Sequence, residues 1–116
     1  MICSNFDIND GVIYINNEKI DLPFPVAEAL EYEQSVIVRV DPPAKEIFNS
    51  NIYRFTLSGD CLWQIESSPH GTEDNKPYVS IYTSSSHDSL VVSNWNGVDY
   101  IVNIEDGSVE VKSFRK

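Results

Sequence analysis

The stretch that decides the fold class spans residues 51–65 and reads Asn-Ile-Tyr-Arg-Phe-Thr-Leu-Ser-Gly-Asp-Cys-Leu-Trp-Gln-Ile. Apolar and polar side chains alternate in both halves, with Tyr53 and Phe55 sharing a face of the first half and Trp63 in the middle of the second. Alternation of this kind predicts β-strands, because successive side chains of a strand point to opposite faces. Ser58-Gly59-Asp60 predicts a three-residue turn between them. The stretch therefore predicts a β-hairpin.

The same pattern continues on both sides of this hairpin. Short turns separate most of the alternating segments, and Asn96-Gly97 is the strongest hairpin signal, because both residues tolerate a positive φ. Consecutive hairpins predict an antiparallel meander of about eight strands. The remaining predicted strands cover residues 12–15, 18–22, 35–41, 78–83, 90–94, 99–104 and 109–114.

One segment, residues 23–33, has the features of a short helix instead. Pro25 suits the first turn of a helix, and Glu28 lies where the positive end of the helix dipole favours a carboxylate. Val26 and Leu30 form an i,i+4 apolar pair. We expect this to be the only helix in the chain.

Length and patterning together predict one all-β domain over residues 1–116. A chain of 116 residues has room for a single domain of ordinary size, and 41% hydrophobic residues can form a core. Each alternating strand is expected to keep one face in water. A flat sheet of so many strands would expose too much apolar surface, so we expect a two-layer sandwich or a partly open barrel with the helix covering one side.

The charge balance is strongly acidic. The chain has 8 Lys and Arg against 18 Asp and Glu, which gives a formal net charge of −10 and a pI of about 4.4. Such a surface repels phosphates, which argues against nucleic acid and against anionic lipid as partners. A basic protein partner, a cation, or a role of the charge in solubility alone stays open.

The chain carries no recognisable targeting signal, so we expect a cytoplasmic protein. No segment approaches the roughly 20 apolar residues that cross a bilayer, and the first residues lack the basic flank and apolar run of a secretory signal. Two cysteines, Cys3 and Cys61, are too few for a disulfide framework. Cys61 lies in a strand pattern and is expected to behave as a small buried hydrophobe, while its pairing with Cys3 stays open.

No arrangement of residues predicts catalysis, metal binding or a cofactor. Ser85-Ser86-His87-Asp88 contains the residue types of a hydrolase triad, but adjacent residues cannot converge as a triad requires, so we interpret it as a polar turn. His70 and His87 are the two histidines, and their spacing with Glu73 or Asp74 matches no zinc site. We expect no catalytic residue, no metal ligand and no cofactor.

The two tryptophans are predicted to differ in role. Trp63 alternates with apolar neighbours and is expected in the core. Trp95 is out of phase with Leu90 and Val92. It therefore either covers a second apolar layer or stands exposed as an anchor for a partner.

Acidic residues gather in the predicted turns, which a meander places at alternate ends of the sheet. Glu73 and Asp74 in the long loop fall at the same end as the Asn96-Gly97 turn, whereas Asp88 and Glu105-Asp106 fall at the other. We favour the first end as the binding surface, because the long loop can adapt and aromatic residues flank it. Tyr78 and Tyr82 either contribute to a solvated binding surface or merely flank the sheet. The predicted partner-binding residues are Glu73, Asp74, Tyr78, Trp95 and Asp99.

Two stretches carry a resemblance to known sequences. Residues 51–65 fit the pattern N-x-Y-x-F-x-x-x-G-x-x-x-W-Q-I, and residues 94–97 fit N-W-x-G. In these patterns the chain resembles small uncharacterised β-rich bacterial proteins over its C-terminal half. Small acidic domains of this kind are in turn similar to immunity proteins of bacterial toxin systems, including contact-dependent growth inhibition. The resemblance implies an inhibitor without an active site to transfer.

The leading hypothesis is a non-enzymatic protein-binding module, an immunity protein that neutralises a basic, nuclease-like toxin domain. A nuclease needs a basic cleft to hold phosphates, so its inhibitor gains from carboxylates that steer encounter and from aromatic anchors that slow release. The alternative is an accessory or structural β-domain in a housekeeping complex, and a small enzyme is a third possibility. The sequence does not predict the oligomeric state.

Overall fold

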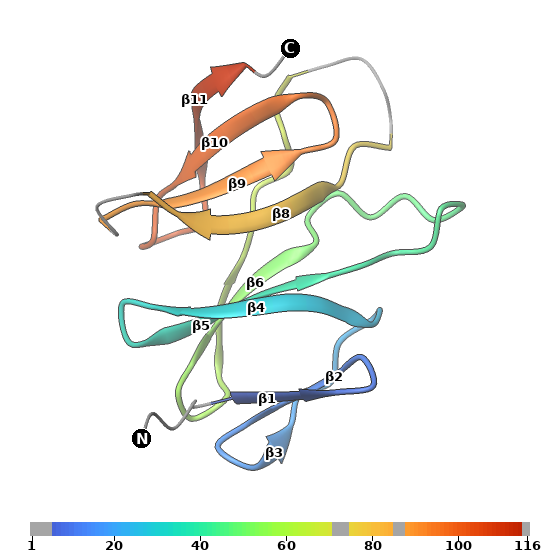
Figure 1. Ribbon diagram of the computed structural model, residues 1–116, viewed down its shortest axis with the longest axis vertical. Helices are drawn as coiled ribbons and strands as arrows, with labels where there is room; N and C mark the ends of the chain where they lie inside the picture. Colours follow the sequence, from blue (N-terminus) through green and yellow to red (C-terminus); the bar gives the residue numbers. More distant parts are fainter. Residues whose placement is uncertain (1–5, 71–74, 85–87, 115–116) are drawn as a thin grey trace.

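The computed structural model describes residues 6–70, 75–84 and 88–114, and this part of the chain is all β (Figure 1). It contains eleven strands in three antiparallel sheets and no helix. The all-β prediction is confirmed, whereas the prediction of about eight strands was too low. The strands are β1 (Phe6–Asn9), β2 (Val12–Ile15), β3 (Glu18–Lys19), β4 (Val26–Tyr32), β5 (Ser35–Val40), β6 (Ile52–Thr56), β7 (Cys61–Gln64), β8 (Tyr78–Thr83), β9 (Leu90–Asn94), β10 (Val98–Val102) and β11 (Val109–Phe114).

Each sheet is a meander of consecutive strands. The first sheet has the order β1-β2-β3, the second β4-β5-β6-β7 and the third β11-β10-β9-β8. Figure 1 shows them as three layers, with the second sheet between the first and the third. The prediction of a two-layer sandwich or a partly open barrel was therefore wrong for the described residues. The connections from β3 to β4 and from β7 to β8 contain prolines and separate one sheet from the next. Proline has no N–H to donate, so strand pairing does not continue through these connections.

Strand β5, inside the second sheet, is buried on both faces. Val36 and Val38 of β5 are fully buried and pack in one core with Ile13 of the first sheet. Ile37, equally buried, points the other way and packs in a second core with Tyr100 of the third sheet. The expectation that every strand keeps one wet face was wrong here, since β5 lies inside the stack.

Residues 23–33 do not form a helix, and the prediction of a short helix there was wrong. Val26–Tyr32 is strand β4, which pairs with β5 in antiparallel register. The central position of β5 demands a hydrogen-bonded neighbour on each side, and β4 supplies one of them. A cross-strand ion pair joins the two strands, with Arg39 Nε 2.7 Å from Glu28 Oε2. Strand pairing therefore outweighs the local helix preference of Ala, Glu and Leu.

The turn between β4 and β5 has no sequence signal that favours a hairpin. Glu33 and Gln34 both have a positive φ, at 51° and 58°. Positive φ at both central residues is the geometry of a tight two-residue hairpin, which normally selects Asn or Gly. The hairpin is held by the pairing of its strands and not by its turn residues.

Truncation of a β5 side chain should test the double burial. Val38→Ala should lower the free energy of unfolding by about 2–3 kcal/mol, because it removes two buried methyl groups and leaves a cavity between sheets. The matched control is Val79→Ala, where the valine is 41% exposed, and its effect should stay within about 0.5 kcal/mol. Urea unfolding measures both. Equal losses in the two variants would contradict the stacked arrangement.

Candidate functional site

The third sheet has two ends that differ in character. Cross-strand pairs Thr83–Leu90, Leu90–Val102 and Val102–Val109 place the 84–89 and 103–108 turns at one end. The Asn96-Gly97 turn lies at the other end, where Asn96 Nδ2 donates to the backbone oxygen of His70 in the long loop. The predicted distribution of turns between the two ends is therefore confirmed for the described residues.

Trp95 forms the tip of the β9–β10 turn. The backbone N–H of Gly97 donates to the Asn94 carbonyl, and the N–H of Asn96 donates to Asn94 Oδ1. Gly97 has φ 89°, a conformation that glycine adopts without strain. The turn holds the Trp95 side chain outward, where 59% of its surface is exposed. Of the two alternatives for Trp95, the structure shows the exposed one.

A pocket of about 490 Å³ lies beside Trp95, and we call it the Trp95 pocket. Its walls come from three separate segments: the loop after β5, the approach to β8 and the β9–β10 turn. Apolar side chains dominate, and Glu46 and Asn75 supply the polar groups. The lining residues are Pro42, Pro43, Ala44, Glu46, Asn75, Pro77 and Trp95.

Buried asparagines hold these segments together. Asn51 is fully buried, and its Nδ2 donates to the carbonyls of Val40 (3.0 Å) and Tyr78 (2.9 Å) while its Oδ1 accepts from the Tyr78 N–H (2.9 Å). Asn94, also fully buried, donates from Nδ2 to the Lys76 carbonyl at 2.9 Å. The N–H of Trp95 donates to the Pro77 carbonyl. These hydrogen bonds hold the pocket walls in place without a ligand, whereas Oδ1 of Asn75 in the wall is buried without a hydrogen-bond partner.

A second polar network closes the same end of the sheet. The Tyr100 hydroxyl, fully buried with its ring, shares a hydrogen bond with Ser68 Oγ and a 3.0 Å hydrogen bond with His70 Nδ1. Asn96 Nδ2 donates to Ser68 Oγ at 2.8 Å. Ser68 is only 3% exposed, so its hydroxyl is directed into the network and away from solvent. The network fastens the long loop to the β9–β10 turn.

The predicted partner-binding residues are only partly brought together. Glu73 and Asp74 lie outside the described residues. Trp95 is exposed, as the alternative of a partner anchor requires. Tyr78 is 1% exposed and Asp99 7% exposed, so the expectation that they flank a solvated surface was wrong. A register shift between Tyr78 and Ser80 turns the Tyr78 ring into the core.

The buried tyrosine and aspartate have internal partners. The Tyr78 hydroxyl donates to the Glu66 carbonyl at 2.6 Å, and its ring meets that of Tyr100 edge-on. The Tyr82 hydroxyl, on the outer face of the third sheet, lies 3.3 Å from Asp99 Oδ2 and donates to it. Through these contacts, Tyr78 and Asp99 each stabilise the third sheet.

Two other expectations concern the β6–β7 hairpin. Trp63 is 7% exposed, which confirms its place in the core, and its Nε1 donates to the Ile104 carbonyl at 2.7 Å. Gly107 packs against the indole so closely that an added Cβ would lie 2.7 Å from it. Cys61 is exposed with a free thiol, so its predicted burial was wrong. The pairing of β6 with β7 skips Leu62, and this register shift changes the face on which Cys61 lies. Cys3 lies outside the described residues.

The opposite end of the third sheet gathers acids, beside a pocket of about 310 Å³ at the β10–β11 turn. The pKa of the Tyr32 phenol is raised by burial and by the carboxylates of Glu33 and Asp88. Asp106 accepts hydrogen bonds from the Ser108 N–H (3.0 Å) and hydroxyl (2.7 Å), which lower its pKa. Ser84 Oγ donates to Asp88 Oδ1, in the turn that contains the serine-rich stretch 85–87 outside the described residues.

Two further kinds of feature are absent from the described residues. No group of three or more His, Cys, Asp or Glu side chains there is arranged to hold a metal ion. Among the same residues, no helix is long and apolar enough to cross a membrane.

Comparison with known proteins identifies a family. A family model described as "Domain of unknown function (DUF7957)" matches residues 3–114, nearly the whole chain. The chain therefore belongs to this family. No curated protein matches it.

Alkaline pH should destabilise the fold through Tyr78. Burial, followed by the effects of Tyr100 and Glu66, raises the pKa of this phenol well above its ordinary value of 10.0. The unfolded chain thus loses the proton at a lower pH than the folded chain, so the free energy of unfolding falls as pH rises above about 10. Tyr78→Phe should cost about 1–2 kcal/mol at neutral pH, because the Glu66 carbonyl loses a donor. It should also make the alkaline decline shallower.

Urea unfolding of both proteins at neutral and alkaline pH measures the two effects. Val79→Ala, at an exposed side chain of β8 that carries no titratable group, serves as the control and should leave the alkaline decline as it is in the unmodified chain. The same alkaline slope in the unmodified chain and in Tyr78→Phe would contradict this role of Tyr78.

Proposed function

We propose that this member of the DUF7957 family is a non-enzymatic protein-binding module that takes a basic partner at the Trp95 pocket. More specifically, we propose an immunity protein that neutralises a basic, nuclease-like toxin domain. The observation that carries the proposal is an exposed tryptophan at the rim of a preformed, mainly apolar pocket.

The Trp95 pocket has the features of an interface anchor. Trp95 has 59% of its surface in water, a large apolar area for a side chain that could have been buried in the core. Tryptophan is enriched among the residues that dominate binding energy, and such anchors act where they become fully desolvated. Because Asn51 and Asn94 already hold the walls, the pocket loses little conformational entropy when a partner side chain enters.

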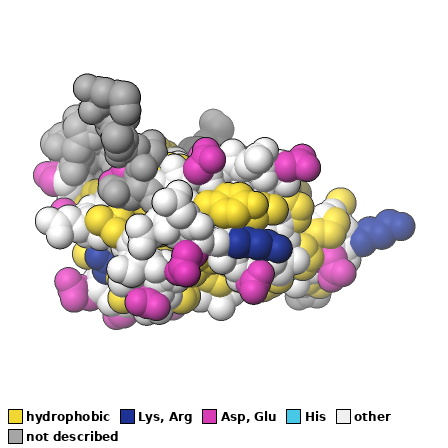
Figure 2. Space-filling model, turned by 90° about the horizontal axis from the view of Figure 1, so that it is seen from below, with side chains coloured by type: hydrophobic (Ala, Val, Ile, Leu, Met, Phe, Trp, Pro, Cys, Tyr) yellow, Lys and Arg dark blue, Asp and Glu magenta, His cyan; other side chains and the backbone are white. Residues whose placement is uncertain are grey.

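The charge of the chain supports a basic partner. Net charge −10 attracts a positive surface over distances of about a Debye length, which raises the association rate at low salt. Figure 2, a view of the molecule from below, shows acidic side chains spread over the surface around apolar areas and outnumbering basic ones. The attraction therefore follows from the net charge of the chain, while the Trp95 pocket supplies the local contact.

The alternative of an accessory β-domain in a housekeeping complex would use the same kind of surface. The identity of the bound polypeptide distinguishes an immunity protein from an accessory domain. We propose to co-express the chain with the product of the gene immediately upstream of its own. Restored growth of cells that this product alone kills supports immunity. Binding to a metabolic protein, with no toxin encoded nearby, supports the alternative.

Removal of the anchor should speed release of the partner. Trp95→Ala should raise the dissociation rate at least tenfold, because the desolvated aromatic contact is lost, and should change the association rate little. Leu62→Ala, at a side chain 48% exposed on β7, is the matched control and should leave both rates nearly unchanged. Surface plasmon resonance with the bound partner measures the rates. An unchanged dissociation rate in Trp95→Ala would place the anchor elsewhere.

Charge-reversal variants should show which end of the third sheet binds the partner. Glu73→Lys with Asp74→Lys should slow association at low salt and flatten its salt dependence, with thermal stability nearly unchanged. The comparison variant carries Asp88, Glu105 and Asp106 as lysines and should have the smaller effect on association rate. The comparison variant could instead lose binding while the association rate of the Glu73→Lys, Asp74→Lys variant stays unaltered. That result would show that the end with Asp88, Glu105 and Asp106 binds the partner.

A further inference from the structure

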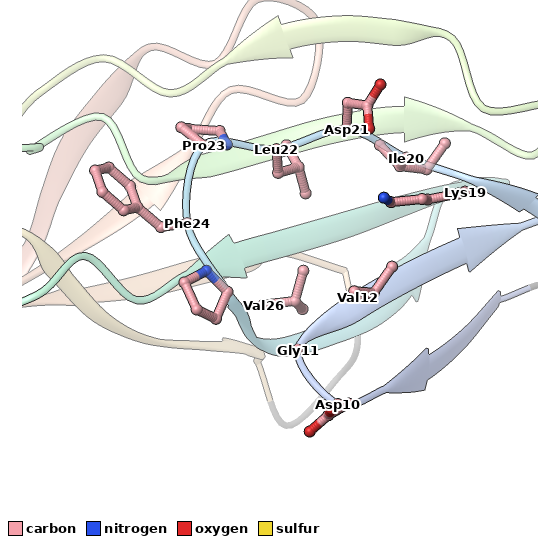
Figure 3. A pocket seen from close by; sticks show the side chains of 11 residues that line it. Asp10, Gly11, Val12, Lys19, Ile20, Asp21, Leu22, Pro23, Phe24 and Val26 are labelled. Atoms are coloured by element: carbon pink, nitrogen blue, oxygen red, sulfur yellow. The ribbon is translucent and has the colours of Figure 1, made fainter.

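A second pocket lies far along the chain from Trp95, between the first and second sheets. It has a volume of about 320 Å³ and is formed by the β1–β2 turn and the connection from β3 to β4. Figure 3 shows Val12, Leu22 and Val26 projecting into this space. We call it the Lys19 pocket, because the Lys19 amine points into the same space.

The electrostatics of this pocket are unusual for so acidic a chain. Lys19 forms no ion pair with any residue that the structure describes, where the one salt bridge joins Arg39 to Glu28. Two acids, Asp10 and Asp21, also border the pocket, but Figure 3 shows their carboxylates directed away from its centre. The pocket thus brings the ammonium group of Lys19, an exposed residue, beside the apolar side chains of Val12, Leu22 and Val26.

The frame of the Lys19 pocket is held by the backbone. The N–H of Val26 donates to the Gly11 carbonyl at 2.9 Å, and the N–H of Asp41 donates to the Pro25 carbonyl at 2.8 Å. Gly11 passes so close to Pro25 that an added Cβ would lie 3.1 Å from the proline Cβ, and its φ of 80° also favours glycine. The pocket is therefore preformed, as small-molecule sites usually are.

We propose that the Lys19 pocket binds a small amphipathic carboxylate, an alkyl chain of medium length that ends in one carboxylate group. The carboxylate would pair with Lys19 Nζ, and the alkyl chain would lie against Val12, Leu22 and Val26. At roughly 30 Å³ for each water-sized group, the volume accommodates about ten non-hydrogen atoms, the size of octanoate.

A peptide terminus fits this pocket less well than a small molecule. Prolines 23 and 25 in the wall have no N–H, and the carbonyls of Gly11 and Pro25 already accept hydrogen bonds. An entering peptide would leave its own amides without partners, which costs free energy, whereas an alkyl chain needs none. The proposal does not depend on the proposed function, since the site is separate from the Trp95 pocket.

The test uses the full chain and sodium octanoate, followed by the amide signals of Gly11, Leu22 and Val26 in two-dimensional NMR. We expect saturable shifts confined to this pocket, and binding at least tenfold weaker for octan-1-ol and for octylammonium chloride, which lack the carboxylate. Lys19→Met keeps most of the apolar stem and should weaken octanoate binding at least tenfold. Lys45→Met, at an exposed lysine outside the pocket, should bind as the unmodified chain does.

Three outcomes would overturn the proposal. The first is equal binding of octanoate and octanol, which would make the pocket merely apolar. The second is unchanged binding in Lys19→Met, with thermal unfolding confirming that the variant is folded. The third is tighter binding of an acetylated tetrapeptide with a free C-terminal valine than of octanoate, which would make a chain terminus the occupant. Each of them leaves the result at Trp95 unaffected, so failure here is distinguishable from failure of the proposed function.

Discussion

Burial of both faces of β5, in the second sheet, is the constraint on which the rest of the structure depends. β5 has Val36 and Val38 in one core and Ile37 in the other, all fully buried. A strand in that position must find a hydrogen-bonding neighbour on each side and a covering sheet above and below, because unpaired backbone groups cannot be hydrated there. The strand state of β4, the separate first sheet and the stacking of three layers all satisfy this demand.

The sequence predicts the strands well and their assembly poorly, for a physical reason. Alternation reports which side chains of a strand share a face. The hairpin predicted at 51–65 matches β6 and β7, and the strand predicted at 90–94 matches β9. Alternation does not report whether the second face is wet. Ile37 and Arg39 share a face of β5, so the pattern looks half-polar, yet Ile37 is buried and Arg39 is paired with Glu28. The helix expected at 23–33 fails for the same reason, since local preference does not include the neighbour that β5 requires.

The candidate site was predictable at one residue and hidden at the others. Trp95 stands out because it is out of phase with the apolar face of its strand. Tyr78 was misplaced because a register shift, invisible in the sequence, rotates its ring inward. In the sequence, Asn51 and Asn94 are merely the first residues of two short patterns and carry no signal of burial. In the structure they are the fully buried amides that join β5, β8 and the β9–β10 turn. A buried asparagine has no periodicity, so only the structure shows what it binds.

Both pockets lie where the chain passes from one pairing partner to another, and proline explains why they persist there. Of the 6 prolines in the chain, Pro42, Pro43 and Pro77 line the Trp95 pocket, and Pro23 and Pro25 line the Lys19 pocket. A wall of ordinary residues would present N–H groups that need partners, which favours collapse onto a neighbouring strand. A proline wall has no such donor and fixes φ, so an apolar hollow beside it remains open at little cost. The proline-containing breaks between paired strands thus give this β-stack the Trp95 and Lys19 pockets, while the strands give it stability.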